Sequence, residues 1–407
     1  MLDVLVIGAG PAGLFAADQL AARGFKIEII DRMPSPARKF LMAGRGGLNI
    51  THSEDLEDFL GRYREATPFL APMIEAFPPK ALIDWCHALG QDTFVGSSGR
   101  VFPVAMKASP LLRALLRRLE DNGVALQTRH SLKGLSGENT AIVQTEAGET
   151  SEFGARAILL ALGGASWPKL GSTAAWVPLL EEHGVRVNPF QPANCGFQIA
   201  WSPFLRDKFS GSPLKRIGLG IADHHVRGEA TLSEKGLEGG AVYALSADIR
   251  TTIARLGSAE LDVDLRPAMA IDQLAEKLAR PRGKQTWSNF LKKTLKLKPV
   301  EIALIHENGP LPDDPGALAR RIKGVKLGTS SPYPIDRAIS SAGGIALDEV
   351  DEAMMLHKVP GVFTAGEMLD WEAPTGGYLL QACFATAYRA ASGIETYLKT
   401  APLEQKP

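Results

Sequence analysis

Cysteine is scarce in this sequence. The 407 residues include three cysteines, Cys86, Cys195 and Cys383, and no Cys-x-x-Cys pair. Three thiols cannot build a disulfide framework, which favours a reducing compartment, and we expect a cytoplasmic protein. The missing Cys-x-x-Cys pair also excludes redox enzymes that relay electrons through a dithiol.

Excess charge and long apolar runs are also missing. Lys and Arg together number 45, as do Asp and Glu, so the formal net charge is zero. This argues against a protein that coats nucleic acid, and we expect no nucleic-acid partner. No run approaches 18 apolar residues, so we expect no membrane span, and Met1-Leu2-Asp3 lacks the basic start of a signal peptide. We also expect no metal site, because no Cys, His and carboxylate cluster has ligand spacing.

What is present is the composition of an ordinary globular protein, 45% hydrophobic and 22% charged, long enough for two or three domains. Strand-like runs and helical patterns alternate up to about residue 189; strands and turns dominate to about residue 266. Helical patterns are expected at 55–89, 109–122, 268–306 and 380–399, with an irregular loop at 34–53 and a break at 309–316. A hairpin is expected from the runs 140–145 and 151–153 around Ala147-Gly148.

The clearest motif is a phosphate-binding turn at the N-terminus. The apolar run 4–7 leads into Gly8-x-Gly10-x-x-Gly13, a helical pattern follows, and a second apolar run ends at Asp31. The glycines allow a tight turn and close approach to a pyrophosphate, the helix N-terminus attracts its charge, and Asp31 is placed to accept hydrogen bonds from a ribose. A tight turn without ligand is the alternative. The residues assigned here to a dinucleotide are Gly8, Ala9, Gly10, Pro11, Ala12, Gly13, Asp31 and Arg32.

Two later segments complete a dinucleotide site. Residues 159–164 are expected to form an apolar strand that passes through Ala161 and ends in Gly163-Gly164. Residues 362–367 are expected to form a second strand, which ends in Gly366-Glu367. Gly376-Gly377 then begin a long helix, whose N-terminal dipole would stabilise the anion that a flavin develops on reduction. A domain that binds only NAD would not need this second helix start, and we therefore expect FAD.

These residues carry a resemblance to a known family. The chain from about residue 3 to 397 resembles the HI0933-like, or BaiN-like, family of FAD-dependent oxidoreductases. The matching stretches are the N-terminal turn, Arg38–Leu41 with Asn49-Ile50-Thr51, Gly99–Pro103, Ala161–Ser166 with Gly171–Thr173, Ser341–Gly344, Ala365–Glu367, and Thr375–Tyr378 with Gln381.

The resemblance implies an α/β fold: a glutathione-reductase-like FAD-binding Rossmann domain with an inserted β-barrel-like domain and a small helical subdomain. The expected boundaries are 1–189 with 335–407 for the FAD domain, 190–267 with 317–334 for the β-rich insert, and 268–316 for the helical part. One loop departs from the family, which usually has Thr-Gly-Gly-Gly-Arg-Cys-Asn where this chain has Ala43-Gly44-Arg45-Gly46-Gly47-Leu48-Asn49. The chain is thus a divergent member, and no role of that Cys carries over.

Several further residues are candidates for the site, each with a plainer alternative. In the 44–49 loop, Gly44, Arg45 and Gly46 are expected near the cofactor, although Arg45 could be a surface arginine. Asn49 and Thr51 could bind the isoalloxazine edge or cap the loop. The resemblance places Gly366–Asp370 beside the ribityl chain, with Asp370 as an acceptor and Glu367 as either cofactor contact or structural residue. The remaining cofactor candidates are Arg38, Lys39, Leu132, Gly376, Gly377 and Tyr378.

No catalytic acid or base is evident. The candidates for catalysis are Arg45, Asn49, Tyr378 as an aromatic donor, and Arg100 as an anion clamp; Tyr378 could equally be a core residue. Gly218-x-Gly220 lacks the third glycine and a following helix, so no second nucleotide domain is expected and NAD(P)H would dock transiently.

Two functions remain open. The first is an FAD-dependent oxidoreductase that reduces or dehydrogenates a small organic substrate by hydride transfer through flavin N5. The alternative is an FAD-binding protein in RNA modification or in an assembly. The basic stretch Lys284–Lys298 could touch membrane or nucleic acid, but its leucine spacing is typical of an amphipathic helix with a solvated face. The sequence specifies neither substrate nor oligomeric state.

Overall fold

The computed structural model describes residues 2–137 and 139–400. The described residues form two compact units, one comprising those up to 191 and from 340 onward and the other comprising 192–339. The chain leaves the first unit along β10 (Val187–Ala193) and returns along β17 (Ser340–Ile345), and these two strands pair with each other. Each unit has its own hydrophobic core.

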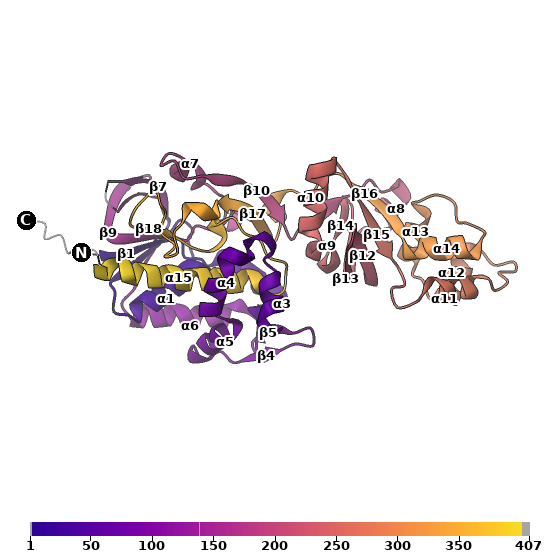
Figure 1. The fold of residues 1–407 in the computed structure, drawn as a ribbon, viewed down its shortest axis with the longest axis horizontal. Coiled ribbons are helices and arrows are strands. Elements are labelled where there is room, and N and C mark those ends of the chain that lie inside the picture. Colours follow the sequence, from indigo (N-terminus) through magenta and orange to yellow (C-terminus); the bar gives the residue numbers. More distant parts are fainter. Residues whose placement is uncertain (1, 138, 401–407) are drawn as a thin grey trace, which may run out of the picture. The chain divides into compact units, whose positions relative to one another are not determined.

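The first unit is built on a mixed sheet (Figure 1). Five strands run parallel in the order β6-β2-β1-β9-β18, and β8 and β7 continue from β9 as antiparallel strands. The apolar runs of the central strands β1, β2, β9 and β18 are buried on both faces, as in other parallel sheets. The bounds are β1 (Leu2–Ile7), β2 (Ile27–Asp31), β6 (Ala125–Thr128), β7 (His130–Ser136), β8 (Thr140–Thr145), β9 (Thr150–Leu160) and β18 (Val362–Thr364).

Helices pack around this sheet. α1 is buried along most of its length, because it contacts both α15 and α6 as well as the sheet. A small sheet, β3-β5-β4, lies beside the N-terminus of α15. The bounds are α1 (Pro11–Ala21), α2 (Arg38–Ala43), α3 (Leu56–Gly61), α4 (Thr67–Ala76), α5 (Pro79–Ala88), α6 (Ala108–Asp121), α7 (Val177–Glu181), α15 (Tyr378–Thr400), β3 (Thr51–His52), β4 (Thr93–Val95) and β5 (Arg100–Pro103), with 3-10 turns at Gly44–Gly46, Arg64–Ala66, Pro168–Leu170, Leu347–Glu349 and Gly366–Met368.

The second unit combines an antiparallel sheet, β11-β14-β13-β12-β15-β16, with helices. The bounds are β11 (Phe197–Gln198), β12 (Pro213–Ile221), β13 (His224–Ser233), β14 (Gly236–Glu238), β15 (Ala259–Asp264), β16 (Val325–Thr329), α8 (Pro203–Phe209), α9 (Gly240–Ala244), α10 (Ser246–Leu256), α11 (Ile271–Leu278), α12 (Trp287–Leu295), α13 (Pro299–His306) and α14 (Pro315–Lys323), with a 3-10 turn at Ile335–Arg337. Sheet and helices share one core, so the division of this unit into β-rich and helical parts stays a proposal.

Most expected elements are present, and the expected irregular loop at 34–53 was wrong. The 34–53 segment contains α2, a 3-10 turn and β3, because the helix-favouring run Arg38–Ala43 is long enough for one and a half turns. Residues 317–323 belong to α14, which Asp314 caps by accepting a hydrogen bond from the Ala317 N–H at 2.6 Å. The hairpin around Gly148 forms between β8 and β9.

Candidate functional site

The phosphate-binding turn has the geometry that its glycines predict. Gly8 has φ +108°, and a Cβ there would lie 2.3 Å from the Ala161 carbonyl oxygen. A Cβ on Gly13 would lie 2.0 Å from the Gly8 carbonyl oxygen, so α1 can reach β1 this closely only with glycine. Gly10 is the helix N-cap and has open space around it. The turn thus presents the backbone N–H groups of α1 to a free volume.

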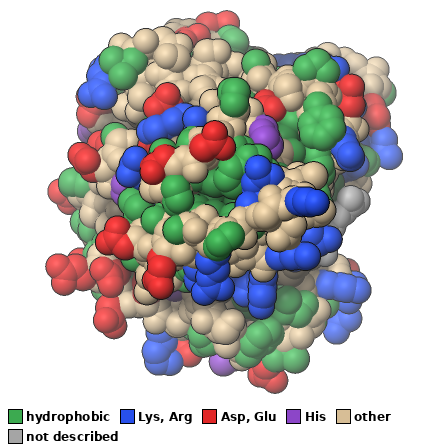
Figure 2. Space-filling view, turned by 90° about the vertical axis from the view of Figure 1, so that its right-hand side faces the viewer, with side chains coloured by type: hydrophobic (Ala, Val, Ile, Leu, Met, Phe, Trp, Pro, Cys, Tyr) green, Lys and Arg blue, Asp and Glu red, His purple; other side chains and the backbone are tan. Residues whose placement is uncertain are grey.

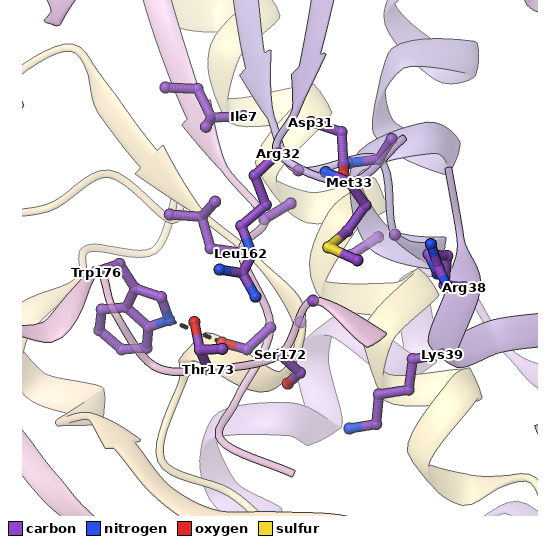
Figure 3. Close-up of a pocket in the computed structure, with 18 of the residues that line it drawn as sticks. Ile7, Asp31, Arg32, Met33, Arg38, Lys39, Leu162, Ser172, Thr173 and Trp176 are labelled. Atoms are coloured by element: carbon purple, nitrogen blue, oxygen red, sulfur yellow. Dashed lines mark hydrogen bonds between the residues drawn. The ribbon is translucent and has the colours of Figure 1, made fainter. Parts of the chain in front are cut away.

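That volume is a cavity of about 220 Å³ at the carboxyl edge of the parallel strands (Figure 3). It opens where β1, β2, β9 and β18 end, the place where doubly wound folds bind nucleotides. In Figure 3, Arg32 and Met33 from the end of β2 face Thr173 and Trp176 across it. The expected site residues that line it are Gly8, Ala9, Gly10, Pro11, Ala12, Asp31, Arg32, Arg38, Lys39, Leu132, Ala161, Gly163, Gly366 and Glu367.

Asp31 fixes the turn from inside the cavity. Its Oδ2 accepts a hydrogen bond from the Ala9 N–H at 2.7 Å, and its Oδ1 accepts one from the Met33 N–H at 2.7 Å. Burial raises the pKa of Asp31, opposed by these two hydrogen bonds and by Arg32. Each oxygen keeps a further lone pair that a ribose hydroxyl can use.

A second charged group, Lys39 with Glu367, lines the cavity near the end of β18. Lys39 Nζ donates to Glu367 Oε2 at 2.8 Å and to Ser166 Oγ at 2.7 Å. Glu367 Oε1 is buried and finds no hydrogen-bond partner among the described residues. A buried carboxylate oxygen that accepts no hydrogen bond destabilises the folded protein. Glu367 Oε1 can therefore accept a hydrogen bond from a ligand.

Asp370 lies elsewhere. It is not among the residues that line the cavity, and its Oδ2 accepts a hydrogen bond from Asn188 Nδ2 at 2.6 Å. The neighbouring carboxylate, Glu367, therefore meets the geometric requirement for a ribityl contact better than Asp370 does.

The glycine-rich loop and the start of α15 meet outside this lining. A Cβ on Gly377 would lie 2.5 Å from the Thr51 Cα, so the two backbones touch. Thr51 Oγ1 donates to Gln381 Oε1 at 2.8 Å, and Asn49 Nδ2 donates to the carbonyl oxygens of Thr51 and Val101. Asn49 Oδ1 is buried and has no hydrogen-bond partner in the part of the chain that the structure describes. Asn49 can therefore accept one more hydrogen bond, whereas the Thr51 hydroxyl donates within the protein.

Tyr378 belongs to a separate polar cluster. Its hydroxyl donates to Glu54 Oε1 at 2.6 Å, and Arg62 binds the same carboxylate through Nε and Nη2 at 3.1 and 2.6 Å. The His52 ring stacks on Tyr378 with centroids 5.5 Å apart. Burial raises the pKa of Tyr378, and the hydrogen bond to Glu54 raises it further. The phenol of Tyr378 is therefore neutral, and its hydrogen bond to Glu54 fixes its position.

The other expected residues are dispersed. Arg100 is exposed on β5, opposite His52 in the small sheet. Gly44 packs against Ala108, Gly46 is exposed in the 3-10 turn, and Gly164 lies over Ser341, with Gly376 beneath the Tyr378 ring. The side chain of Arg45 lies outside the described part of the structure.

Several lining residues were not predicted individually. Trp176 Nε1 donates to the Gly163 carbonyl at 2.9 Å, and Ser172 Oγ donates to that of Gly164 at 2.8 Å, so the 171–176 loop is tied to the end of β9. The Gly171–Thr173 family motif could have identified this loop. Cys383, on α15, lines the cavity without any sequence signal. Other unpredicted lining residues are Met33, Ser35, Phe40, His130, Ser131 and Lys133.

In the described ranges, His, Cys and carboxylate side chains form no group of three or more that could hold a metal ion. A separate search of the same residues finds no helix with the length and apolar character needed to cross a membrane.

Comparison with known proteins gives full-length matches. The chain is 23% identical over 405 residues to the ribosomal RNA dihydrouridine synthase of Escherichia coli (strain K12), covering 96% of this chain and 98% of that protein. It is 25% identical over 402 residues to the 3-dehydro-bile acid delta(4,6)-reductase of Clostridium scindens, covering 95% and 97%.

Solved structures share the fold. A 3-ketosteroid delta1-dehydrogenase from Sterolibacterium denitrificans matches with a TM-score of 0.55 at 13% identity, over 97% of this chain and 99% of that chain. A flavocytochrome c3 fumarate reductase matches with a TM-score of 0.54 at 16% identity, over 98% and 78%. The model of the HI0933-like protein Rossmann domain matches residues 2–393. The chain therefore belongs to the HI0933-like family and is an FAD-dependent oxidoreductase.

Proposed function

We propose that this protein reduces a carbon–carbon double bond conjugated to a carbonyl group in a small organic molecule, with NAD(P)H as a transient electron donor. The observation that carries the proposal is the chemistry shared by two full-length relatives. A delta(4,6)-reductase of a 3-dehydro-bile acid and a dihydrouridine synthase are both named for the saturation of a double bond conjugated to a carbonyl group. The same flavin site can serve both reactions, since each adds a hydride and a proton across such a bond.

FAD fits the residues that are present. The Gly8–Gly13 turn and the N-terminus of α1 suit the pyrophosphate, and Asp31 suits the ribose. Glu367 Oε1 and Asn49 Oδ1 are buried acceptors that no described residue satisfies, and they suit a ribityl hydroxyl and the ring N–H of the isoalloxazine. Bound FAD supplies hydride transfer through its N5 atom. The helix dipole of α15 would favour negative charge near Gly376 and Gly377.

A dedicated nicotinamide domain is not needed for this proposal. Gly218 and Gly220 lie inside β12, which pairs on both sides with antiparallel strands, so they form no turn into a helix. NAD(P)H would therefore dock only transiently, in the cleft that also takes the substrate. A cytoplasmic location suits the three cysteines, all of which are buried.

The test is an anaerobic titration of the purified holoprotein. We expect NADH or NADPH to bleach the flavin absorbance, and a cyclic enone to restore it. The matching saturated ketone should not restore it, because it lacks the double bond. A colourless protein that cannot be reconstituted with FAD, or a flavin that neither donor bleaches, would sink the proposal.

The second candidate is reduction of a uracil ring within RNA. It is favoured by the names of two full-length relatives, both ribosomal RNA dihydrouridine synthases, at 23% identity each. Reduced holoprotein would be incubated with RNA, and the nucleosides analysed by mass spectrometry for the two added hydrogens of dihydrouridine. Unchanged uridine in an RNA that the protein binds would exclude this candidate.

A further inference from the structure

One segment of the second unit departs strongly from the neutral charge of the chain. Residues 279–300, which include α12, contain seven Lys and Arg and no Asp or Glu. Six of the seven are exposed, and Arg282 is half-buried. Figure 2 looks onto the side of the second unit where α11, α12 and α14 lie in Figure 1, and Lys and Arg side chains gather on the lower right of that view.

The helix α12 holds part of this charge in a fixed orientation. Thr286 caps the helix, its Oγ1 accepting a hydrogen bond from the Asn289 N–H at 3.3 Å. Phe290, Leu291 and Leu295 are buried in the core of the unit. Lys292 and Lys293 are exposed on the last turns of the helix, and Lys296, the C-cap residue with φ 54°, is exposed directly after it. Among the described residues, these three ammonium groups have no carboxylate partner within ion-pair distance.

A planar pair lies at the start of the same helix. The Arg282 guanidinium carbon lies 4.9 Å from the Trp287 ring centroid, and Arg282 also donates to the Gln285 carbonyl. Both side chains are half-buried, so each plane is held by packing yet keeps an accessible part. Tryptophan rings and guanidinium planes are the surfaces on which unpaired bases stack, and fixed lysines pair with backbone phosphates.

We propose that Lys292, Lys293 and Lys296, together with the Arg282–Trp287 pair, form an RNA-docking surface, here called the α12 basic surface. This proposal rests on the second candidate function, the reduction of a uracil ring within RNA. It adds the part of the chain that would bind the RNA. The main competitor is an anionic membrane, which favours helices with an exposed apolar face. The apolar face of α12 is already buried in the core, which favours RNA. The acidic group nearest in sequence is Glu301, which is buried and paired with Arg266, and Asp272 lies on the neighbouring α11.

The binding test uses the holoprotein and a labelled, single-stranded, uridine-rich RNA oligonucleotide, measured by fluorescence anisotropy. The variant Lys292→Gln/Lys293→Gln/Lys296→Gln should weaken binding about tenfold or more. It should also reduce the slope of log K against log salt by about 2, since each phosphate contact on a single strand contributes about 0.7. Trp287→Ala should weaken binding, and Trp287→Phe should restore most of it.

The matched control is Lys208→Gln/Lys215→Gln/Lys235→Gln, which removes the same charge from exposed lysines of the same unit. It should retain most of the affinity and the salt slope. Equal losses in the two triple variants, no RNA binding by the parent protein, or binding to phosphatidylglycerol vesicles instead of RNA would each overturn the proposal.

The enone titration, carried out on the same preparations, distinguishes failure of the RNA-docking proposal from failure of the proposed reductase activity. Enone reduction without RNA binding removes the α12 basic surface and leaves the reductase intact. RNA binding that depends on the three lysines, in a protein that reduces neither enone nor uridine, supports the surface and refutes the proposed chemistry.

Discussion

The Tyr378 hydroxyl donates its hydrogen bond to Glu54 Oε1 at 2.6 Å, across 324 residues of sequence. Glu54 also accepts two hydrogen bonds from Arg62, so the carboxylate that holds the Tyr378 hydroxyl is itself fixed in position. Tyr378 is also the first residue of α15, directly after Gly376-Gly377. The cluster therefore anchors the start of the helix that we expect to face the flavin.

Tyr378→Phe should retain FAD and lower turnover by less than about tenfold. The reason is that the hydroxyl proton is engaged with Glu54, so Tyr378 orients the helix start and does not protonate the substrate. Loss of a catalytic acid typically costs roughly 10²–10⁴-fold, and a drop of that size in kcat would contradict the assignment.

Stability should depend on the ionisation of Glu54 in acid. Burial raises the pKa of Glu54, but hydrogen bonds from Arg62 and Tyr378 outweigh it and hold the value below the ordinary 4.5. A pKa lower in the folded than in the unfolded state gives stabilisation that is complete above the unfolded value and is lost as pH falls through the folded one. The difference in unfolding free energy between the parent and Glu54→Gln should be constant near neutral pH and should shrink below pH 4.5. A difference that grows on acidification would show the opposite sign.

Glu367 and Asp370 can be distinguished by matched amide variants. Glu367→Gln should weaken FAD binding roughly tenfold, about 1.4 kcal/mol, because the oxygen that would accept a ribityl hydroxyl loses its charge. Asp370→Asn should leave FAD affinity unchanged, because Asp370 lies outside the cavity lining and binds Asn188. Fluorescence quenching on FAD titration into apoprotein measures both. The reverse order of effects would return the ribityl contact to Asp370.

Substitutions of Gly13 and Gly10 should affect different properties, the first the stability of the apoprotein and the second the retention of FAD. Gly13→Ala should lower the unfolding free energy of the apoprotein by roughly 1–3 kcal/mol, since its Cβ would meet the Gly8 carbonyl oxygen. Gly10→Ala should leave apoprotein stability intact, because nothing lies within 4 Å of its Cβ, yet it should lose FAD where the methyl enters the cavity. Denaturant unfolding and flavin content after purification provide the two readouts. Retained FAD in Gly10→Ala would refute the pyrophosphate site.

The three thiols should be inert in the native protein. Cys86, Cys195 and Cys383 are buried, and burial raises the pKa of Cys86 to about 12 and that of Cys383 well above its usual range. Thiolate is the reactive form, so a thiol-specific disulfide reagent should titrate them only after denaturation. Rapid reaction of a native thiol would show that one of these segments opens.

Local pattern made much of the site predictable. The order of Gly8, Gly10, Gly13 and Asp31 specifies a strand, a turn, a helix and an acid, and all four lie where their spacing indicates. The choice of Asp370 over Glu367 was not decidable in this way, because both follow the same strand and only their packing differs. Net charge was similarly uninformative about residues 279–300, since it averages over the whole chain.

The sequence alone determined that the chain holds a dinucleotide on parallel strands, because hydrophobic periodicity and glycine spacing act over a few residues and leave a direct trace. The tertiary structure decided which distant groups meet. Glu54 with Tyr378 and Lys39 with Glu367 are brought together although more than 300 residues separate the partners of each pair. Such contacts depend on the path of the chain between them, and no spacing along the sequence encodes that path.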